Sequence, residues 1–139
     1  MKIAKHFKLH ELVDKKTLLL HGVECWNFFS DEAIDMIDGL REFFFSPITV
    51  NNWYWKGQFS FRGYRPPSYP IEKSPAGSMH RFGMAFDMDI KGISAAEART
   101  AILADKDHKL LKNIMRMEGN VNWLHVDLKT GKERIYVFT

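Results

Sequence analysis

In two segments of the sequence apolar residues occupy every second position, and this alternation constrains the fold more than any other feature. The first, "MAFDMDI" at 84–90, separates Ala85, Asp87 and Asp89 from Met84, Phe86, Met88 and Ile90. The second, "NWLHVDL" at 122–128, separates Trp123, His125 and Asp127 from Leu124, Val126 and Leu128. Because successive side chains of a strand point to opposite faces of a sheet, the alternation predicts two half-buried strands. Their polar faces carry aspartates and a histidine.

The remaining segments predict a mixture of helices and strands. "SDEAIDMIDGLREFFFS" at 30–46 predicts a helix capped by Ser30, and "SAAEARTAIL" at 94–103 predicts a helix with Ser94 and Glu97 as a capping box. The other expected elements are a short helix or turn in 7–16, a helical segment over 109–117, and strands over 48–55 and 134–138. The turn "KTGKE" joins the last two strands as an antiparallel hairpin. Together these elements predict an α+β fold with a mixed, mainly antiparallel sheet and flanking helices.

Length, composition and charge narrow the class of protein. The chain has 139 residues, 45% of them hydrophobic, which predicts one domain, 1–139, with a real core. No apolar run approaches the ~20 residues of a membrane span, so we expect no span. The N-terminus shows no signal peptide, so we expect synthesis in the cytoplasm. The net charge of +3 comes from basic residues scattered among acids, which argues against a nucleic-acid partner.

Three further features have more than one interpretation. The single cysteine, Cys25, excludes an internal disulfide, and its apolar neighbours favour a buried thiol over a nucleophile. Residues 56–78 are rich in Gly, Pro and Ser and predict a long loop, which is usually functional or mobile. The aromatic residues of "NNWYW" at 51–55 are interpreted as core and cleft wall, with a carbohydrate platform as the alternative.

Three residues together suggest metal chemistry. His80 lies at the mouth of the long loop, Asp87 lies in the strand that follows, and His125 lies in the second alternating segment. Two imidazoles and one carboxylate form a three-ligand set for a catalytic Zn²⁺ with its fourth position open for water. Such a centre activates water and polarises a carbonyl, which suits amide hydrolysis. From the pattern alone, an ordinary polar pair between a strand histidine and an aspartate is the alternative.

The flanking residues resemble a known family. "SMHRFGMAFDMDI" resembles the S-x-H-x-x-G-x-A-x-D signature of the zinc D-Ala-D-Ala carboxypeptidase and endopeptidase family, whose fold is shared with the hedgehog signalling domain. "RGYRPP" is similar to the S-G-Y-R segment of that family, "WLHVDL" to the strand with the second histidine, and "KHFKLHELV" to the opening of phage and bacterial members. The resemblance implies a hedgehog-type fold and assigns His80, Asp87 and His125 as zinc ligands. Gly83 and Ala85 would let the backbone and the ligands approach closely.

The resemblance also implies roles for residues around the metal. Arg65 would bind the substrate carbonyl or carboxylate and stabilise the oxyanion, with Arg62 as a competing candidate and Ser78 as a second substrate-binding residue. Many members carry an acid three residues before the second histidine, where this chain has Asn122. Other branches carry a glutamate further upstream, so we expect Glu118, at the end of the helical segment over 109–117, to be the general base.

The other acids and histidines near these motifs have weaker assignments. Asp89 and Asp127 are either hydrogen-bond partners of the ligand histidines or solvated strand residues. The remaining histidines have no partner pattern and are interpreted as surface or satisfied residues: His6, His10, His21 and His108.

By this resemblance the chain is expected to be a zinc peptidase that hydrolyses bonds in peptidoglycan stem peptides. A lysin or a virion-associated domain of a phage fits best, acting on the wall after release, with peptidoglycan and other virion proteins as partners. The alternative, raised by Asn122, is a non-catalytic virion or wall-binding module that retains the zinc fold.

Overall fold

Five short strands form one sheet at the centre of the structure. The computed structural model describes residues 1–139. The strands lie in the order β1-β2-β4-β3-β5, and every neighbouring pair is antiparallel except β3 and β5, which are parallel. Their bounds are β1 Ile48–Thr49, β2 Ala85–Ile90, β3 Arg116–Glu118, β4 Leu124–Asp127 and β5 Tyr136–Phe138. The mixed, mainly antiparallel sheet of an α+β fold is therefore confirmed.

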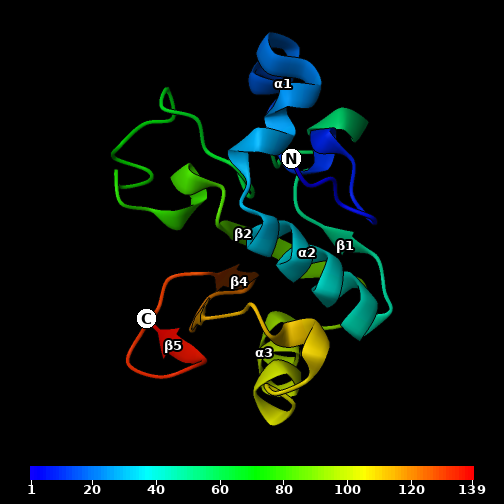
Figure 1. Cartoon of the computed structure of the whole chain (residues 1–139), viewed down its shortest axis with the longest axis vertical. Coiled ribbons are helices and arrows are strands. Elements are labelled where there is room, and N and C mark those ends of the chain that lie inside the picture. Colours follow the sequence, from blue (N-terminus) through cyan, green and yellow to red (C-terminus); the bar gives the residue numbers. More distant parts are fainter.

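Three α-helices and several 3-10 turns surround the sheet (Figure 1). The two helices predicted with serine caps are confirmed: the Ser30 side chain accepts a hydrogen bond from the Ala33 amide, and Ser94 and Glu97 form the capping box. None of the helices has the length and apolar character that a membrane crossing requires. The helices are α1 Lys15–His21, α2 Asp31–Phe44 and α3 Ala95–Ala104, and the turns are η1 Leu9–Glu11, η2 Gly22–Phe28, η3 Trp53–Trp55, η4 Met79–Phe82 and η5 Lys109–Leu111.

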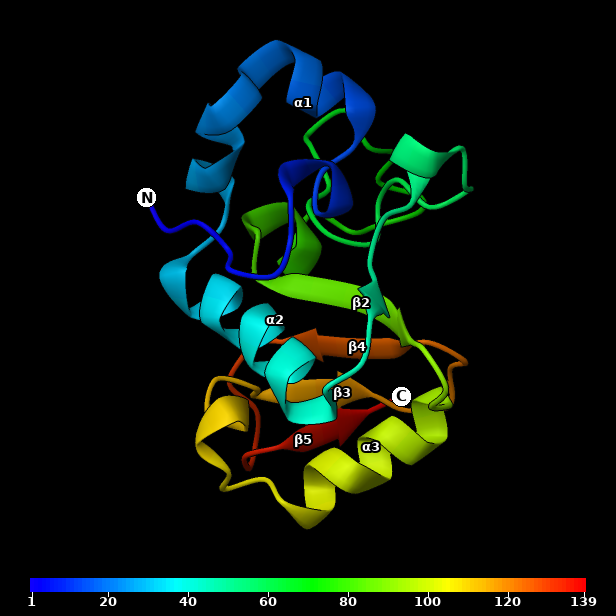
Figure 2. The same ribbon diagram turned by 90° about the vertical axis from the view of Figure 1, so that its right-hand side faces the viewer.

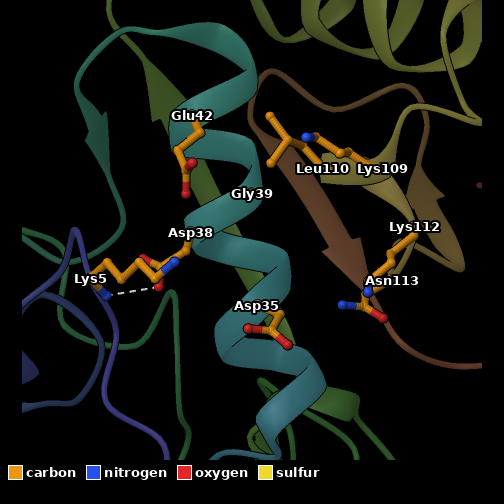
Figure 3. A pocket seen from close by; sticks show the side chains of 9 residues that line it. All are labelled: Lys5, Asp35, Asp38, Gly39, Glu42, Lys109, Leu110, Lys112 and Asn113. Atoms are coloured by element: carbon orange, nitrogen blue, oxygen red, sulfur yellow. Dashed lines mark hydrogen bonds between the residues drawn. The ribbon is translucent and has the colours of Figure 1, made fainter.

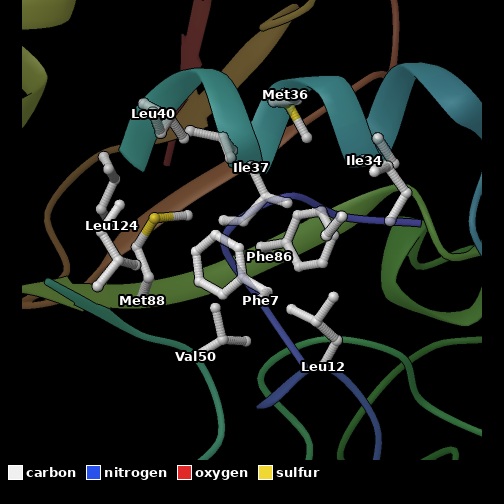
Figure 4. Close-up of a cluster of buried hydrophobic side chains, with 14 of the residues drawn as sticks. Phe7, Leu12, Ile34, Met36, Ile37, Leu40, Val50, Phe86, Met88 and Leu124 are labelled. Carbon is white, nitrogen blue, oxygen red and sulfur yellow. The ribbon is translucent and has the colours of Figure 1, made fainter. Parts of the chain in front are cut away.

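The core lies on one face of the sheet, between the strands and the helices. Figure 2 shows β2, β4, β3 and β5 side by side, with α2 and α3 on the same side of them. In Figure 4, Ile37 and Leu40 of α2 point toward Phe86, Met88 and Leu124 of the strands, and all five are fully buried. The apolar face predicted from the alternation is therefore the core face. The opposite face of the sheet is left for the polar residues.

The buried thiol and the long loop agree with the sequence analysis. Cys25 is fully buried, and burial raises the pKa of its thiol. Residues 56–78 contain no helix or strand and run from η3 to η4. A nucleophilic role for Cys25 does not fit this position, because the thiolate form is disfavoured in apolar surroundings.

Three sequence predictions about the strands and helices are wrong. The segment 109–117 is not a helix, because η5 ends at Leu111 and β3 begins at Arg116. The predicted strand over 48–55 shortens to β1, and Trp53–Trp55 form η3 instead. The last strand pairs with β3 rather than forming a hairpin with β4, which already has β2 and β3 on its two edges. Whether a short segment forms a strand depends on the strands beside it more than on the propensity of its own residues. Helix-favouring residues such as Met117 therefore do not predict the strand β3.

A close contact between α2 and η5 depends on Gly39 (Figure 3). A Cβ atom at this position would overlap the carbonyl oxygen of Leu110. On the same helix, the carboxylate of Asp38 accepts hydrogen bonds from the amides of Lys5 and His6, at 2.8 and 3.0 Å. One turn of α2 thus holds both η5 and the N-terminal segment in place.

We predict that Gly39→Ala destabilises the fold by about 1–3 kcal/mol, because the added methyl group forces η5 away from α2. Helix propensity alone predicts the opposite effect, a gain of about 1 kcal/mol in the free energy of unfolding. Urea unfolding followed by circular dichroism measures the difference. Gly77→Ala is the control, because no atom lies within 4 Å of a Cβ there. Equal stability of Gly39→Ala and wild type would show that the contact is not tight.

Candidate metal centre

The register of the sheet brings the polar residues of three strands together. Asp87 of β2 pairs with His125 of β4, and Met117 of β3 pairs with Val126 of β4. One residue further along this antiparallel register, Glu118 lies beside His125. Directly paired residues point to the same face of a sheet. Asp87, His125 and Glu118 therefore form a row on the face opposite α2 and α3.

His80 reaches this row from η4, outside the sheet. Gly83 ends η4 in the left-handed conformation, at φ 65°, and a Cβ atom there would overlap the carbonyl oxygen of Phe28. Only glycine accepts both the backbone conformation and the close approach without strain. The prediction that Gly83 permits a close backbone approach is confirmed, and the partner is η2. This turn directs the His80 side chain onto Asp87.

His80, Asp87 and His125 lie close enough together to bind one metal ion. Their ligand atoms all lie within 4.8 Å of one another, and the three residues are only 3%, 7% and 6% exposed. His80 Nε2 lies 3.3 Å from Asp87 Oδ2, and His125 Nδ1 lies 2.7 Å from Asp87 Oδ1. Two imidazole nitrogens and a carboxylate thus converge from three separate segments of the chain.

The other nitrogen of each imidazole is held by a protein acceptor. His80 Nδ1 lies 2.8 Å from the carbonyl oxygen of Gly63, to which it donates, and His125 Nε2 lies 2.8 Å from Asp127 Oδ2. Outer contacts of this kind fix the tautomer and the orientation of histidines that bind metals. The donor set therefore fits a metal ion, with His80 Nε2 and His125 Nδ1 as the nitrogens that face Asp87.

The two strand acids with open assignments have different environments. Asp127 is fully buried, contacts His125, and accepts hydrogen bonds from the Arg116 guanidinium at 2.8–3.2 Å. Asp89 is exposed and forms a two-point ion pair with Arg62, at 2.9 and 3.2 Å. Asp127 is therefore the hydrogen-bond partner of a candidate ligand, whereas Asp89 is a surface residue.

The carboxylates already stabilise positive charge at this position. Burial alone would lower the pKa of His125, but its hydrogen bonds to Asp127 and Asp87 outweigh burial and raise the pKa to about 9. Burial alone would raise the pKa of Asp87, but its electrostatic interaction with His80 and the hydrogen bonds from both histidines hold this pKa well below its usual range. A metal ion that binds His125 Nδ1 must therefore displace a proton that Asp87 and Asp127 stabilise.

The predicted site residues divide into those that line one cavity and those that do not. A cavity of about 650 Å³ contains the three candidate ligands together with Glu118, Arg65 and Ser78. Neither Arg62, which pairs with Asp89, nor Asn122, which is exposed, lines this cavity. Glu118 lies on β3, so the sequence prediction that places it at the end of a helix is wrong. The structure thus brings together the residues assigned to catalysis and leaves Arg62 outside.

Arg65 is fixed at the edge of the metal group by its own neighbours. Its Nε donates to the carbonyl oxygen of Phe61 at 2.9 Å, and one terminal nitrogen donates to Ser74 Oγ at 2.9 Å. The other terminal nitrogen lies 3.3 Å from Asp87 Oδ2. The long loop therefore positions the guanidinium against the candidate ligand.

Two arginines of the site were missed by sequence reasoning. Arg81 donates to the carbonyl oxygens of Pro66, Tyr69, Ser74 and Pro75 and so holds the long loop together. Arg116 binds Asp127 and lies 4.0 Å over the ring of Phe138. Recognition of β3 as a strand would have placed Arg116 on the same face as Glu118. No comparable signal in the sequence indicates the role of Arg81.

Comparison of the chain with models of protein families, with curated proteins and with solved structures finds no match. The functional argument therefore depends on the residues and the geometry of the site.

We predict that purified protein binds about one zinc ion per chain, because the three donors converge at a single position. His80→Ala removes one donor and should lose stoichiometric binding, measured by metal analysis after dialysis against trace zinc. His21→Ala is the control, because His21 lies exposed on α1. An unchanged zinc content in His80→Ala would contradict the ligand assignment.

We predict that Asp127→Asn weakens zinc affinity by about 10- to 100-fold, because the carboxylate that holds His125 becomes a neutral amide. Asp89→Asn removes the same charge from the neighbouring strand, but Asp89 contacts no candidate ligand. The zinc affinity of this variant should therefore equal that of wild type. Competition with a chromophoric chelator measures both. An equal effect of the two substitutions would indicate general electrostatics instead of a specific contact.

Proposed function

We propose that this protein is a zinc-dependent peptidase that hydrolyses peptide bonds in the stem peptides of peptidoglycan. The observation that carries the proposal is the group formed by His80, Asp87 and His125 inside a cavity that also contains Glu118 and Arg65. Two histidines and one carboxylate are a typical ligand set of catalytic zinc. When bound, zinc supplies Lewis-acid chemistry that polarises a carbonyl and acidifies water.

Glu118 has the properties of a general base. It lines the cavity, is half-buried, and its carboxylate has neither an ion pair nor a hydrogen bond within the chain. The other two carboxylates of the cavity, Asp87 and Asp127, are each engaged by a histidine and an arginine. Glu118 is thus the acid that is free to accept a proton from the attacking water and to deliver it to the leaving amine.

Arg65 binds the oxygen of the scissile group. Its guanidinium lies beside the candidate ligands and is held by Phe61 and Ser74, so it meets the substrate without reorganising. A fixed cation at this position stabilises the negative charge that develops on the carbonyl oxygen during attack. Ser78, which lines the same cavity, contributes a hydroxyl group to substrate binding.

The substrate class comes from the motifs that resemble the D-Ala-D-Ala carboxypeptidase and endopeptidase family. A stem-peptide bond is the target, either D-Ala-D-Ala or an internal L-Ala-D-Glu type bond, and the hedgehog-type fold belongs to the same proposal. The five-stranded, mainly antiparallel sheet supports it. A phage lysin or virion component is the setting that we propose, with the cell wall and other virion proteins as partners.

A non-catalytic wall-binding module is the second candidate. The observation that favours it is Asn122, which stands where many members of the family carry the catalytic acid. In this alternative the zinc site stabilises a binding surface, and Glu118 has no role in proton transfer.

We predict that Glu118→Gln lowers the rate of muropeptide hydrolysis by about 10²- to 10⁴-fold while zinc content stays unchanged, because an amide cannot accept the proton. Digestion of purified muropeptides followed by mass spectrometry gives the rate, and metal analysis gives the zinc content. Asn122→Ala is the matched control and should hydrolyse at the rate of wild type.

The outcomes separate the candidates. If wild type releases no product from any wall type while it binds zinc, the non-catalytic module is correct. If Glu118→Gln retains full activity, another residue is the base.

A further inference from the structure

The aromatic residues of η3 are neither core nor cavity wall. Tyr54 and Trp55 are 59% and 62% exposed, and neither lines the cavity at the candidate metal centre. The first interpretation of "NNWYW" is therefore wrong for these two side chains. Exposed aromatic rings that lie next to each other mark an interaction site more often than scattered apolar residues do. We refer to Tyr54 and Trp55 as the aromatic platform.

Neighbouring rings support the platform from below. The imidazole of His10, on η1, stacks on Tyr54 with ring centroids 4.1 Å apart and lies 4.9 Å from Trp55 at a right angle. Burial lowers the pKa of His10, so this ring stacks as a neutral imidazole. Trp53 anchors η3 through a hydrogen bond of 2.8 Å from its Nε1 to the carbonyl oxygen of Val13. The exposed rings thus rest on a fixed base.

Hydrogen bonds between the two ends of the loop that carries the platform fix its backbone. The Asn52 amide donates to the carbonyl oxygen of Phe59, and Asn52 Oδ1 accepts from the Phe59 amide at 2.9 Å. The carbonyl oxygen of Asn52 accepts from the amides of Trp55 and Gly57. A binding surface held in this way loses little conformational entropy when a ligand binds. Rigid support of rings that are themselves exposed is not explained by packing alone.

A short segment joins the platform to the candidate metal centre. The guanidinium of Arg62 lies 4.1 Å from the centroid of the Phe59 ring. The carbonyl oxygen of the same arginine accepts a hydrogen bond of 2.7 Å from the Asp87 amide. The carbonyl oxygen of the next residue, Gly63, contacts His80. One continuous segment therefore holds the platform at one end and two candidate ligands at the other.

We propose that the aromatic platform binds the amino-sugar strand of the wall polymer whose peptides enter the metal centre. The identity of the polymer rests on the proposed function, whereas the sugar-binding site rests on the platform itself. A pyranose ring presents an apolar C–H face that stacks on an aromatic ring, and its hydroxyl and acetamido groups point to the rim. The rings of Tyr54 and Trp55 lie at 88° to each other with centroids 5.7 Å apart, so they present two separate aromatic faces, together with a phenol and an indole N–H.

The residues around the platform favour a sugar over other occupants. Lys56 and Gln58, directly after it, and Lys8, before His10, are exposed and polar, so the surface does not continue as the apolar patch that a protein interface needs. The lysines repel a quaternary ammonium ligand, which would otherwise suit an aromatic site. Two lysines are also few for the basic groove that follows a nucleic-acid backbone.

The test uses chitotetraose, a chain of N-acetylglucosamine without peptide, and the full-length protein in EDTA. We expect saturable binding by calorimetry and tryptophan fluorescence, weakened about tenfold or more in Trp55→Ala and in Tyr54→Ala and partly retained in Trp55→Phe. Phe45→Ala is the matched control, because Phe45 is an aromatic residue that is 88% exposed at the end of α2. His80→Ala should bind the sugar as wild type does, because the platform needs no metal.

Each outcome has one meaning for the platform. Absence of chitotetraose binding by folded wild type overturns the inference, and so does equal binding by Trp55→Ala, Tyr54→Ala and Phe45→Ala. Tighter binding of choline or of a thymidine oligonucleotide than of chitotetraose also overturns it. Hydrolysis of muropeptides is measured separately, so failure of the platform leaves the proposed peptidase unaffected, and the reverse also holds.

Discussion

The structure depends on how the buried charges of β2 and β4 compensate one another. Five charged groups form a chain in which the sign alternates, from Arg65 through Asp87, His125 and Asp127 to Arg116, with contacts of 3.3, 2.7, 2.8 and 2.8 Å. A buried charge is tolerated only when it is paired and hydrogen-bonded, and removal of one partner leaves another charge uncompensated. The register of β2 with β4 is therefore tied to electrostatics on one face of the sheet and to hydrophobic burial on the other.

This chain of charges explains why the site is rigid without being closed. Asp87 and Asp127 are held between basic groups, and η4 brings His80 to Asp87 through a turn that only glycine permits at position 83. The cavity above remains large enough to admit a peptide segment. Rigid candidate ligands beneath an open cavity fit the proposed peptidase, in which an ion would be held while the substrate exchanges.

The grouping of His80, Asp87 and His125 could be predicted from the sequence, whereas the contacts that support it could not. Asp87 and His125 lie in the two alternating segments, and His80 lies in the signature that precedes the first of them, so local pattern indicates all three. Asp127 and Asp89 look equivalent in the sequence, and only the paths of Arg116 and Arg62 distinguish them. These partners are 11 and 27 residues away along the chain, respectively, and no local pattern encodes such contacts.

Glu118 shows why the last strand belongs to the site although none of its residues does chemistry. β3 has only three residues, and the β4 side alone would leave its far edge unpaired. β5 pairs with that edge in parallel, matching Glu118 with Phe138, and the Gly119 amide donates to the carbonyl oxygen of Phe138 at 2.7 Å. Phe138 also lies under Arg116, which holds Asp127 and through it His125. The C-terminal strand β5 therefore fixes both the proposed base, Glu118, and Arg116, the last member of the chain of charges. The position of Glu118 relative to the candidate ligands is thus a property of the whole sheet and not of β3 alone.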